Sequence, residues 1–148
     1  MTRSAPWRIG VLTVMALMLS GCVAIDPPAY SELSDPSTDE DLLPIGLGDG
    51  LDIEEDSVRL VGEYDGASFF LAKYGNPNMD AGVCILVSAD DADVGDAAAC
   101  GDGQIRSVWP HWGTARYESE PIVESELDDG WVLISENLMF RPTEQELP

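Results

Sequence analysis

The sequence predicts a mainly β protein, a small antiparallel sheet, sandwich or barrel-like domain that follows a disordered N-terminal tether. Two observations support this prediction. From residue 57 onward, short apolar runs of strand length alternate with turns rich in glycine, proline and aspartate, and no long segment has helical periodicity. Before residue 50, repeated acids and prolines with few aromatic residues cannot bury enough apolar surface to order the chain.

Residues 1–21 have the features of a secretory signal peptide. Arg3 and Arg8 stand in a short region without acids, and an apolar run extends from Ile9 to Leu19. As a helix this run would rise only about 16 Å, roughly half of a 30 Å hydrocarbon core. It is therefore too short to span a membrane, and we expect export.

Residues 19–22, Leu-Ser-Gly-Cys, resemble the lipobox of bacterial lipoproteins. The resemblance implies that a diacylglycerol group is attached to the thiol of Cys22, that a peptidase cleaves before it, and that the lipid holds the protein in the cell membrane at its outer, extracytoplasmic face. Two or three acyl chains suffice for stable anchoring, whereas one is marginal. The alternative is ordinary cleavage after Ala24, which would release a soluble protein beginning at Ile25.

The chain is strongly acidic. Its 148 residues include 28 aspartates and glutamates against 7 lysines and arginines, a formal net charge of −21. This excludes nucleic-acid binding through a basic surface and disfavours lying flat on an anionic leaflet. The charge is typical of a protein that binds cations or a basic partner. The alternative, which we favour, is that it provides solubility in a cell envelope or in a salt-tolerant source.

Residues 22–49 are expected to form a lipid-anchored, acidic, proline-rich tether that self-repulsion keeps extended. The domain then covers 50–148. The boundary is loose, because the apolar residues between Leu42 and Leu51 are also suited to dock on the domain as an N-terminal arm.

The first strands of the domain form a predicted β-hairpin. Val58–Tyr64 and Ala67–Lys73 have strand character, and Asp65–Gly66 between them favours a tight turn in which both residues take positive φ. Gly62 predicts a bulge or a close approach of another segment. Alternation places three apolar residues of the first strand on one face. They are Val58, Leu60 and Tyr64.

Gly82–Ser88 is a nearly continuous apolar run and is predicted to be the central buried strand. The following Asp93–Ala99 is expected to form a short helical turn. Residues 104–109, 114–118 and 131–135 are predicted as short strands, and the tail from Arg141 is expected to fray.

Cys84 and Cys100 predict a disulfide. If Cys22 carries a lipid, they remain as an even pair in an oxidising compartment. Closing a loop of about 15 residues contributes roughly 3 kcal/mol in the chain-entropy model. A redox role is disfavoured because the sequence has no Cys-x-x-Cys.

The aromatic turn around His111 is the candidate ligand-binding site. His111 is the only histidine and lies between Trp109 and Trp112. With Tyr117 and Trp131, these tryptophans are suited to a platform for glycan or peptide. The alternative, which we favour, is that they pack in the core and that His111 is an ordinary loop residue.

The acidic loop 90–102 is the candidate calcium site, with Asp90, Asp91, Asp93 and Asp96 as oxygen ligands. An EF-hand is excluded because the glycine and glutamate that such a loop requires are missing. Zinc is disfavoured, since one histidine and a paired cysteine set offer too few ligands. A hydrolase working through paired carboxylates stays open, but no pair can be chosen and no catalytic residue is assigned.

Residues 56–66, 69–72 and 82–87 are similar to segments of small uncharacterised lipoproteins of high-GC Gram-positive bacteria. The resemblance brings no activity and no site residue. We therefore expect a lipid-anchored, non-enzymatic binding or accessory module whose partner is an envelope protein or a cell-wall ligand. A calcium-binding module is the alternative, followed by the hydrolase.

Overall fold

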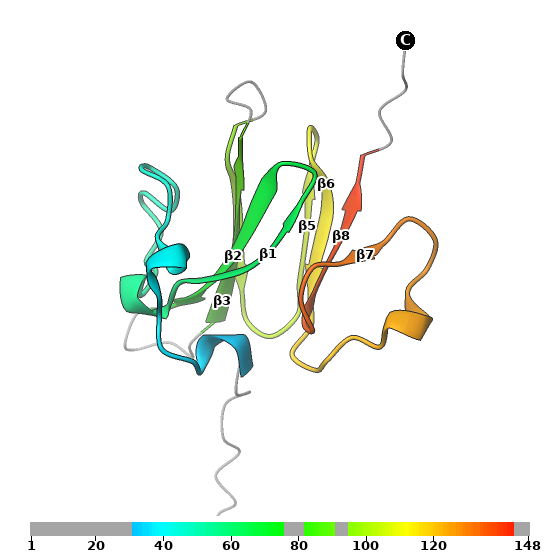
Figure 1. The fold of residues 1–148 in the computed structure, drawn as a ribbon, viewed down its shortest axis with the longest axis horizontal. Helices are drawn as coiled ribbons and strands as arrows, with labels where there is room; N and C mark the ends of the chain where they lie inside the picture. The colour runs from blue at the N-terminus through cyan, green and yellow to red at the C-terminus, as the bar shows by residue number, and fades with distance from the viewer. Residues whose placement is uncertain (1–30, 76–81, 91–94, 144–148) are drawn as a thin grey trace, which may run out of the picture.

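The computed structural model describes residues 31–75, 82–90 and 95–143. It confirms the mainly β class: two antiparallel sheets of four strands each lie against one another as a sandwich (Figure 1). The first sheet has the order β1-β2-β3-β4 and the second β5-β6-β8-β7. The elements are η1 (Ser31–Leu33), η2 (Asp39–Asp41), η3 (Glu55–Ser57), β1 (Arg59–Tyr64), β2 (Ala67–Tyr74), β3 (Gly82–Ala89), β4 (Ala97–Gly101), β5 (Ile105–Trp109), β6 (Gly113–Tyr117), η4 (Glu124–Glu126), β7 (Val132–Leu133) and β8 (Leu138–Pro142).

The predicted hairpin is confirmed. β1 and β2 pair antiparallel around a turn in which Asp65 has φ 49° and Gly66 has φ 76°. Two consecutive positive φ values give the turn a twist that matches the right-handed twist of the strands. The Asp-Gly pair therefore determines where this hairpin reverses.

The prediction that Val58, Leu60 and Tyr64 share one face is wrong, because a bulge at Val61 lies between them. The register passes from Leu60↔Phe70 directly to Gly62↔Phe69. One extra residue exchanges the faces of everything that follows. Tyr64 consequently packs between the sheets, while Leu60 packs on the opposite face of the first sheet.

Gly62 fulfils both roles expected of it. It adjoins the bulge, and a Cβ added there would lie 2.7 Å from the backbone oxygen of Ile134. The first sheet therefore approaches the second too closely at this point for any side chain.

β3 is the buried inner strand that the sequence predicts. Val83, Ile85 and Val87 point into the main core between the sheets, whereas Cys84 and Leu86 point into a second cluster on the other face. Strands covered on both faces have continuous apolar runs rather than alternation. This explains why the Gly82–Ser88 run is unbroken.

β4 corrects the helical turn expected for Asp93–Ala99, because Ala97–Gly101 is a strand. Alanine is the strongest intrinsic helix former, but intrinsic propensity is a weak preference, and pairing with the free edge of β3 outweighs it. The disulfide between Cys84 and Cys100, with Cα atoms 4.0 Å apart, joins two residues that face each other across β3 and β4.

The second sheet contains β8, a strand that sequence reasoning missed. The tail expected to fray from Arg141 is instead paired with β6, with Thr114 opposite Arg141 and Gly113 opposite Pro142. The pairing holds because Leu138 and Phe140 are buried between the sheets. β7 is shorter than predicted, only Val132–Leu133, and residues 144–148 lie outside the described part.

An N-terminal arm, residues 31–58, covers the outer face of the first sheet (Figure 1, blue to cyan). Leu47 and Val58 are buried there against Phe70 and Leu86. Leu33 reaches further, into the main core between the sheets. Docking thus begins well before residue 50.

For residues 31–49 this packing differs from the extended tether expected over 22–49. The physical reason is that single leucines spaced along an acidic segment can each fill a gap in an apolar sheet face, although the segment has no core of its own. Of the leucine-rich stretch, Leu43 and Leu51 pack on the sheet, whereas Leu42 is 73% exposed and Ile45 points fully into solvent.

Candidate functional site

The expected lipidation site, Cys22, lies outside the described residues, as does the signal range 1–21. No helix within 31–75, 82–90 and 95–143 is long and apolar enough to cross a membrane.

Only two of the four candidate calcium ligands can be placed. Asp90 and Asp96 are exposed, while Asp91 and Asp93 lie outside the described residues. Among the residues that the structure describes, no group of three or more histidine, cysteine, aspartate or glutamate side chains is arranged to hold a metal ion.

The aromatic turn does not form a shared platform. Trp109 and Trp112 both pack against the main core, and Trp112 Nε1 donates a hydrogen bond to the Gly95 carbonyl at 3.1 Å. His111 is exposed and lines a cavity of about 310 Å³ with Tyr64 and Trp112. The two indoles are therefore largely occupied by packing, as the core alternative expects.

The outer face of the second sheet carries a concentration of positive charge, which we call the arginine face: Arg106, Arg116 and Arg141. Each follows a residue that is buried in the main core, namely Ile105, Ala115 and Phe140. Because successive side chains of a strand point to opposite faces, burial of the first residue directs the arginine outward. All three arginines are exposed.

Register brings these arginines together from three strands. Arg106 on β5 lies directly opposite Arg116 on β6. Arg116 is opposite Met139 on β8, so Arg141 is its diagonal neighbour two residues along. Directly opposite side chains have Cβ atoms roughly 5 Å apart and diagonal ones roughly 7–8 Å, which leaves all three guanidinium groups within reach of one ligand.

Glu118 positions one of these arginines. Its carboxylate forms an ion pair with Arg116 Nε and accepts a hydrogen bond from Gln104 Nε2. The Glu118 side chain is only 12% exposed. The Glu118 amide donates to the Asn137 carbonyl, and the Asn137 side-chain amide donates to the Glu118 carbonyl. Arg106 and Arg141 form no ion pair with any described residue, so their charge is open to solvent.

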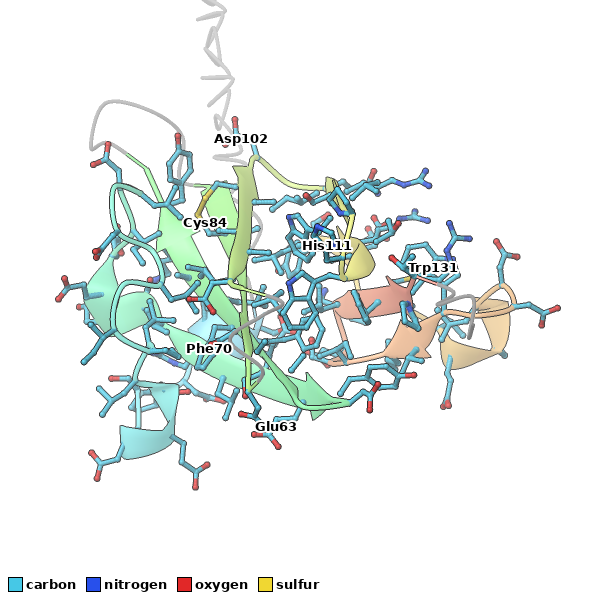
Figure 2. The ribbon with its side chains drawn as sticks, turned by 90° about the horizontal axis from the view of Figure 1, so that it is seen from above. Glu63, Phe70, Cys84, Asp102, His111 and Trp131 are labelled. Carbon is cyan, nitrogen blue, oxygen red and sulfur yellow. A yellow bond between two sulfur atoms is a disulfide. The ribbon has the colours of Figure 1, made fainter. Side chains whose placement is uncertain are left out.

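Trp131 lies over the end of the arginine face. The guanidinium carbon of Arg141 is 5.0 Å from the centre of the indole ring, a cation–π contact that restrains both side chains. Figure 2 shows several side chains with nitrogen tips near Trp131, with oxygen tips both beside them and around the rest of the molecule.

A groove runs along this face, made of three adjoining cavities of about 520, 540 and 670 Å³. The first two share Arg116, Asp128 and Trp131, and the second and third share Arg141. The segment 118–131 forms one wall (Figure 1, yellow to orange). It brings apolar side chains to the groove and covers Met139, which is buried although it points outward. These apolar residues are Ile122, Val123 and Leu127.

Sequence reasoning missed this face, although a signal was present. In each of three segments an arginine follows an apolar or small residue that a strand would bury: Ile105-Arg106, Ala115-Arg116 and Phe140-Arg141. With so few basic residues in an acidic chain, this repeated placement predicts one positive face. The signal was hidden because β8 was not recognised as a strand.

Comparison with protein-family models, with curated proteins and with solved structures finds no match. The fold and the groove therefore define the class: a small disulfide-containing β-sandwich, covered by an N-terminal arm, with a groove on its second sheet whose middle cavity is lined by three arginines.

Proposed function

We propose that this protein is a lipid-anchored, extracytoplasmic lipoprotein whose domain is a non-enzymatic binding module of the cell envelope, and that the groove on the arginine face is its binding surface. The observation that supports the proposal is the placement of charge. In a chain with a net charge of −21, three of the five basic residues in the described part lie on one side of one sheet.

The anchor rests on the lipobox resemblance at residues 19–22. Mass spectrometry of the protein extracted from membranes tests it. We expect a chain that begins at Cys22 and carries a diacylglycerol group, and we expect Cys22→Ala to abolish both processing and membrane retention. An unlipidated chain beginning at Ile25 would contradict the anchor.

Site-directed photocrosslinking in intact cells tests the binding surface. Val108 is 67% exposed and lines the groove with Arg141, whereas Ile45 is fully exposed on the arm across the molecule. A photoreactive residue at position 108 should give a reproducible adduct, and the same residue at position 45 should not. Equal labelling at both positions, or none at 108, would contradict the assignment of this surface.

A further inference from the structure

We propose that the groove binds an acidic glycan, a polymer whose sugar units carry carboxylates, and that the guanidinium groups of Arg106, Arg116 and Arg141 hold those carboxylates. This inference rests on the proposed function and names the ligand class of the same surface.

The length of the groove favours a chain over a compact ligand. The three cavities follow one another from Glu120 to Pro142 through shared lining residues, across the outer face of the sheet. Each alone has the volume of a pocket for a small molecule. Joined end to end they accommodate several consecutive units of an extended polymer.

The distribution of charge favours a slender ligand. The molecule as a whole is strongly negative, and charges are screened over only about 8 Å at physiological salt. A globular anionic protein would bring part of its surface against the acidic surroundings. In the middle cavity Arg106, Arg116 and Arg141 line the groove with a single carboxylate, that of Asp128, whereas Glu118, Glu120 and Asp129 line the outer two cavities. A narrow chain can place a carboxylate in the middle cavity without covering these acidic surroundings.

The unpaired charge of Arg106, directly opposite Arg116, also indicates an anionic ligand. Like charges directly opposite on one sheet face destabilise a fold. Glu118 neutralises Arg116 only, so Arg106 has no ionic partner among the described residues. A carboxylate between the two strands would remove this repulsion.

The side chains around the arginines favour a carboxylated sugar over a phosphodiester polymer. Arginine forms two parallel hydrogen bonds to a carboxylate or to a phosphate, so the arginines by themselves select only for an anion. Trp131 and the apolar wall suit the apolar faces of sugar rings. Gln104 and Asp128 offer acceptors for the several hydroxyls of each sugar ring.

The other two basic residues of the described part serve elsewhere. Arg59 is buried and donates to the carbonyls of Asp35, Asp56 and Val58. Lys73 is on β2 of the first sheet and lines none of the three cavities. It provides a matched control, because its substitution removes the same charge from a different sheet.

The experiment uses the full chain in detergent micelles with EDTA present, titrated calorimetrically with oligogalacturonate. Neutral galacto-oligosaccharide and poly(glycerol phosphate) are the comparison probes. We expect saturable binding of oligogalacturonate, none of the neutral glycan and at least about tenfold weaker binding of the phosphate polymer.

Loss of one charge-assisted contact in Arg106→Gln should weaken binding about tenfold, while Lys73→Gln should not change it. Arg141→Gln provides a second variant, and melting temperatures check that each variant is folded.

Three outcomes would overturn the inference: no binding of oligogalacturonate, binding equal to that of the neutral glycan, or tighter binding of poly(glycerol phosphate). Equal effects of Arg106→Gln and Lys73→Gln would overturn the assigned site. The crosslinking experiment distinguishes failure of the glycan inference from failure of the proposed function. A protein adduct at position 108 without oligogalacturonate binding would refute the glycan and leave the binding module standing, whereas absence of any adduct would refute the module.

Discussion

Asp41 and Arg59 are the two charged side chains buried in the described part of the chain, and both fasten the arm to the first sheet. Asp41 Oδ1 accepts from the Leu60 amide at 2.7 Å, and Oδ2 accepts from the Thr38 amide at 2.6 Å. Arg59 Nε donates to the Asp35 carbonyl at 2.9 Å. The arm and β1 are thus joined through a buried carboxylate and a buried guanidinium, and leaving either group without hydrogen bonds would destabilise the fold.

The pKa of Asp41 is lowered by these contacts. Burial alone would raise the pKa, but hydrogen bonds from the Thr38 and Leu60 amides and the Thr38 hydroxyl, together with the charge of Arg59, hold it below its ordinary value of about 3.8. A lowered folded-state pKa contributes stability that is complete above the unfolded pKa and is lost as the pH falls through the folded pKa.

We therefore expect Asp41→Asn to lower the free energy of unfolding by about 1–3 kcal/mol at neutral pH, because an uncharged amide accepts these hydrogen bonds less well. The difference from the wild type should shrink as the pH falls below about 4. Urea denaturation of the wild type and the variant at neutral pH and again below about pH 4 measures this difference. The Asp39→Asn variant, at an exposed position, is the control. A difference independent of pH would contradict the role of the carboxylate's charge.

Substitution of Arg106 is expected to stabilise the fold, in contrast to substitution of Asp41. Without a ligand, Arg106→Gln should raise the free energy of unfolding by about 0.2–1 kcal/mol, because it removes repulsion with Arg116 directly opposite. Chemical denaturation at low salt measures this. A destabilised variant would show that the arginine has a structural role rather than one in binding.

Among the elements, the arm and the bulge at Val61 have the largest consequences. The arm covers Phe70 and Leu86 on the outer face of the first sheet and thereby allows β3 to be apolar on both sides. The bulge turns Val61 and Tyr64 toward the second sheet, where the Tyr64 and Phe140 rings lie 6.0 Å apart. One sheet can therefore contribute to two apolar clusters.

A pair of leucines in the arm tests whether it docks. Leu33→Ala should lower the free energy of unfolding by about 2–5 kcal/mol, since Leu33 is 3% exposed in the main core. Leu42→Ala should change it by less than about 0.5 kcal/mol, because Leu42 is 73% exposed. Thermal and urea unfolding of both variants measure the difference. Equal, small effects would mean that the arm does not contribute to the folded domain.

At the scale of the whole molecule, positive charge is concentrated in one part of an acidic chain. The arm lies on the outer side of the first sheet (Figure 1), whereas the arginine face belongs to the second sheet, where acidic side chains also line the groove. Net repulsion opposes compactness, whereas the groove gains attraction for anions.

Salt should therefore act on stability and binding in opposite directions. Raising sodium chloride from about 0.01 to about 0.15 M should raise the melting temperature, because it screens the self-repulsion of the acidic chain. The same change should weaken oligogalacturonate binding. Calorimetry of unfolding and of binding across this range measures both. A melting temperature that falls with salt would contradict this account of the charge.

Local chemistry in the sequence was enough to determine several features. Asp65–Gly66 specifies a turn through its positive φ values, Gly62 marks the bulge, and the Gly82–Ser88 run identifies a strand buried on both faces. Cys84 and Cys100 are paired as the sequence predicts. Apart from the cysteine pair, the determining property belongs in each case to residues adjacent in the chain.

Only the tertiary structure decided the rest. Ala97–Gly101 and Leu138–Pro142 are strands because β3 and β6 offer them edges to pair with, and the arm is ordered because a distant sheet offers an apolar face. The arginine face exists only once three strands are in register. Pairing and burial depend on segments far apart in the chain, so no local pattern contains them.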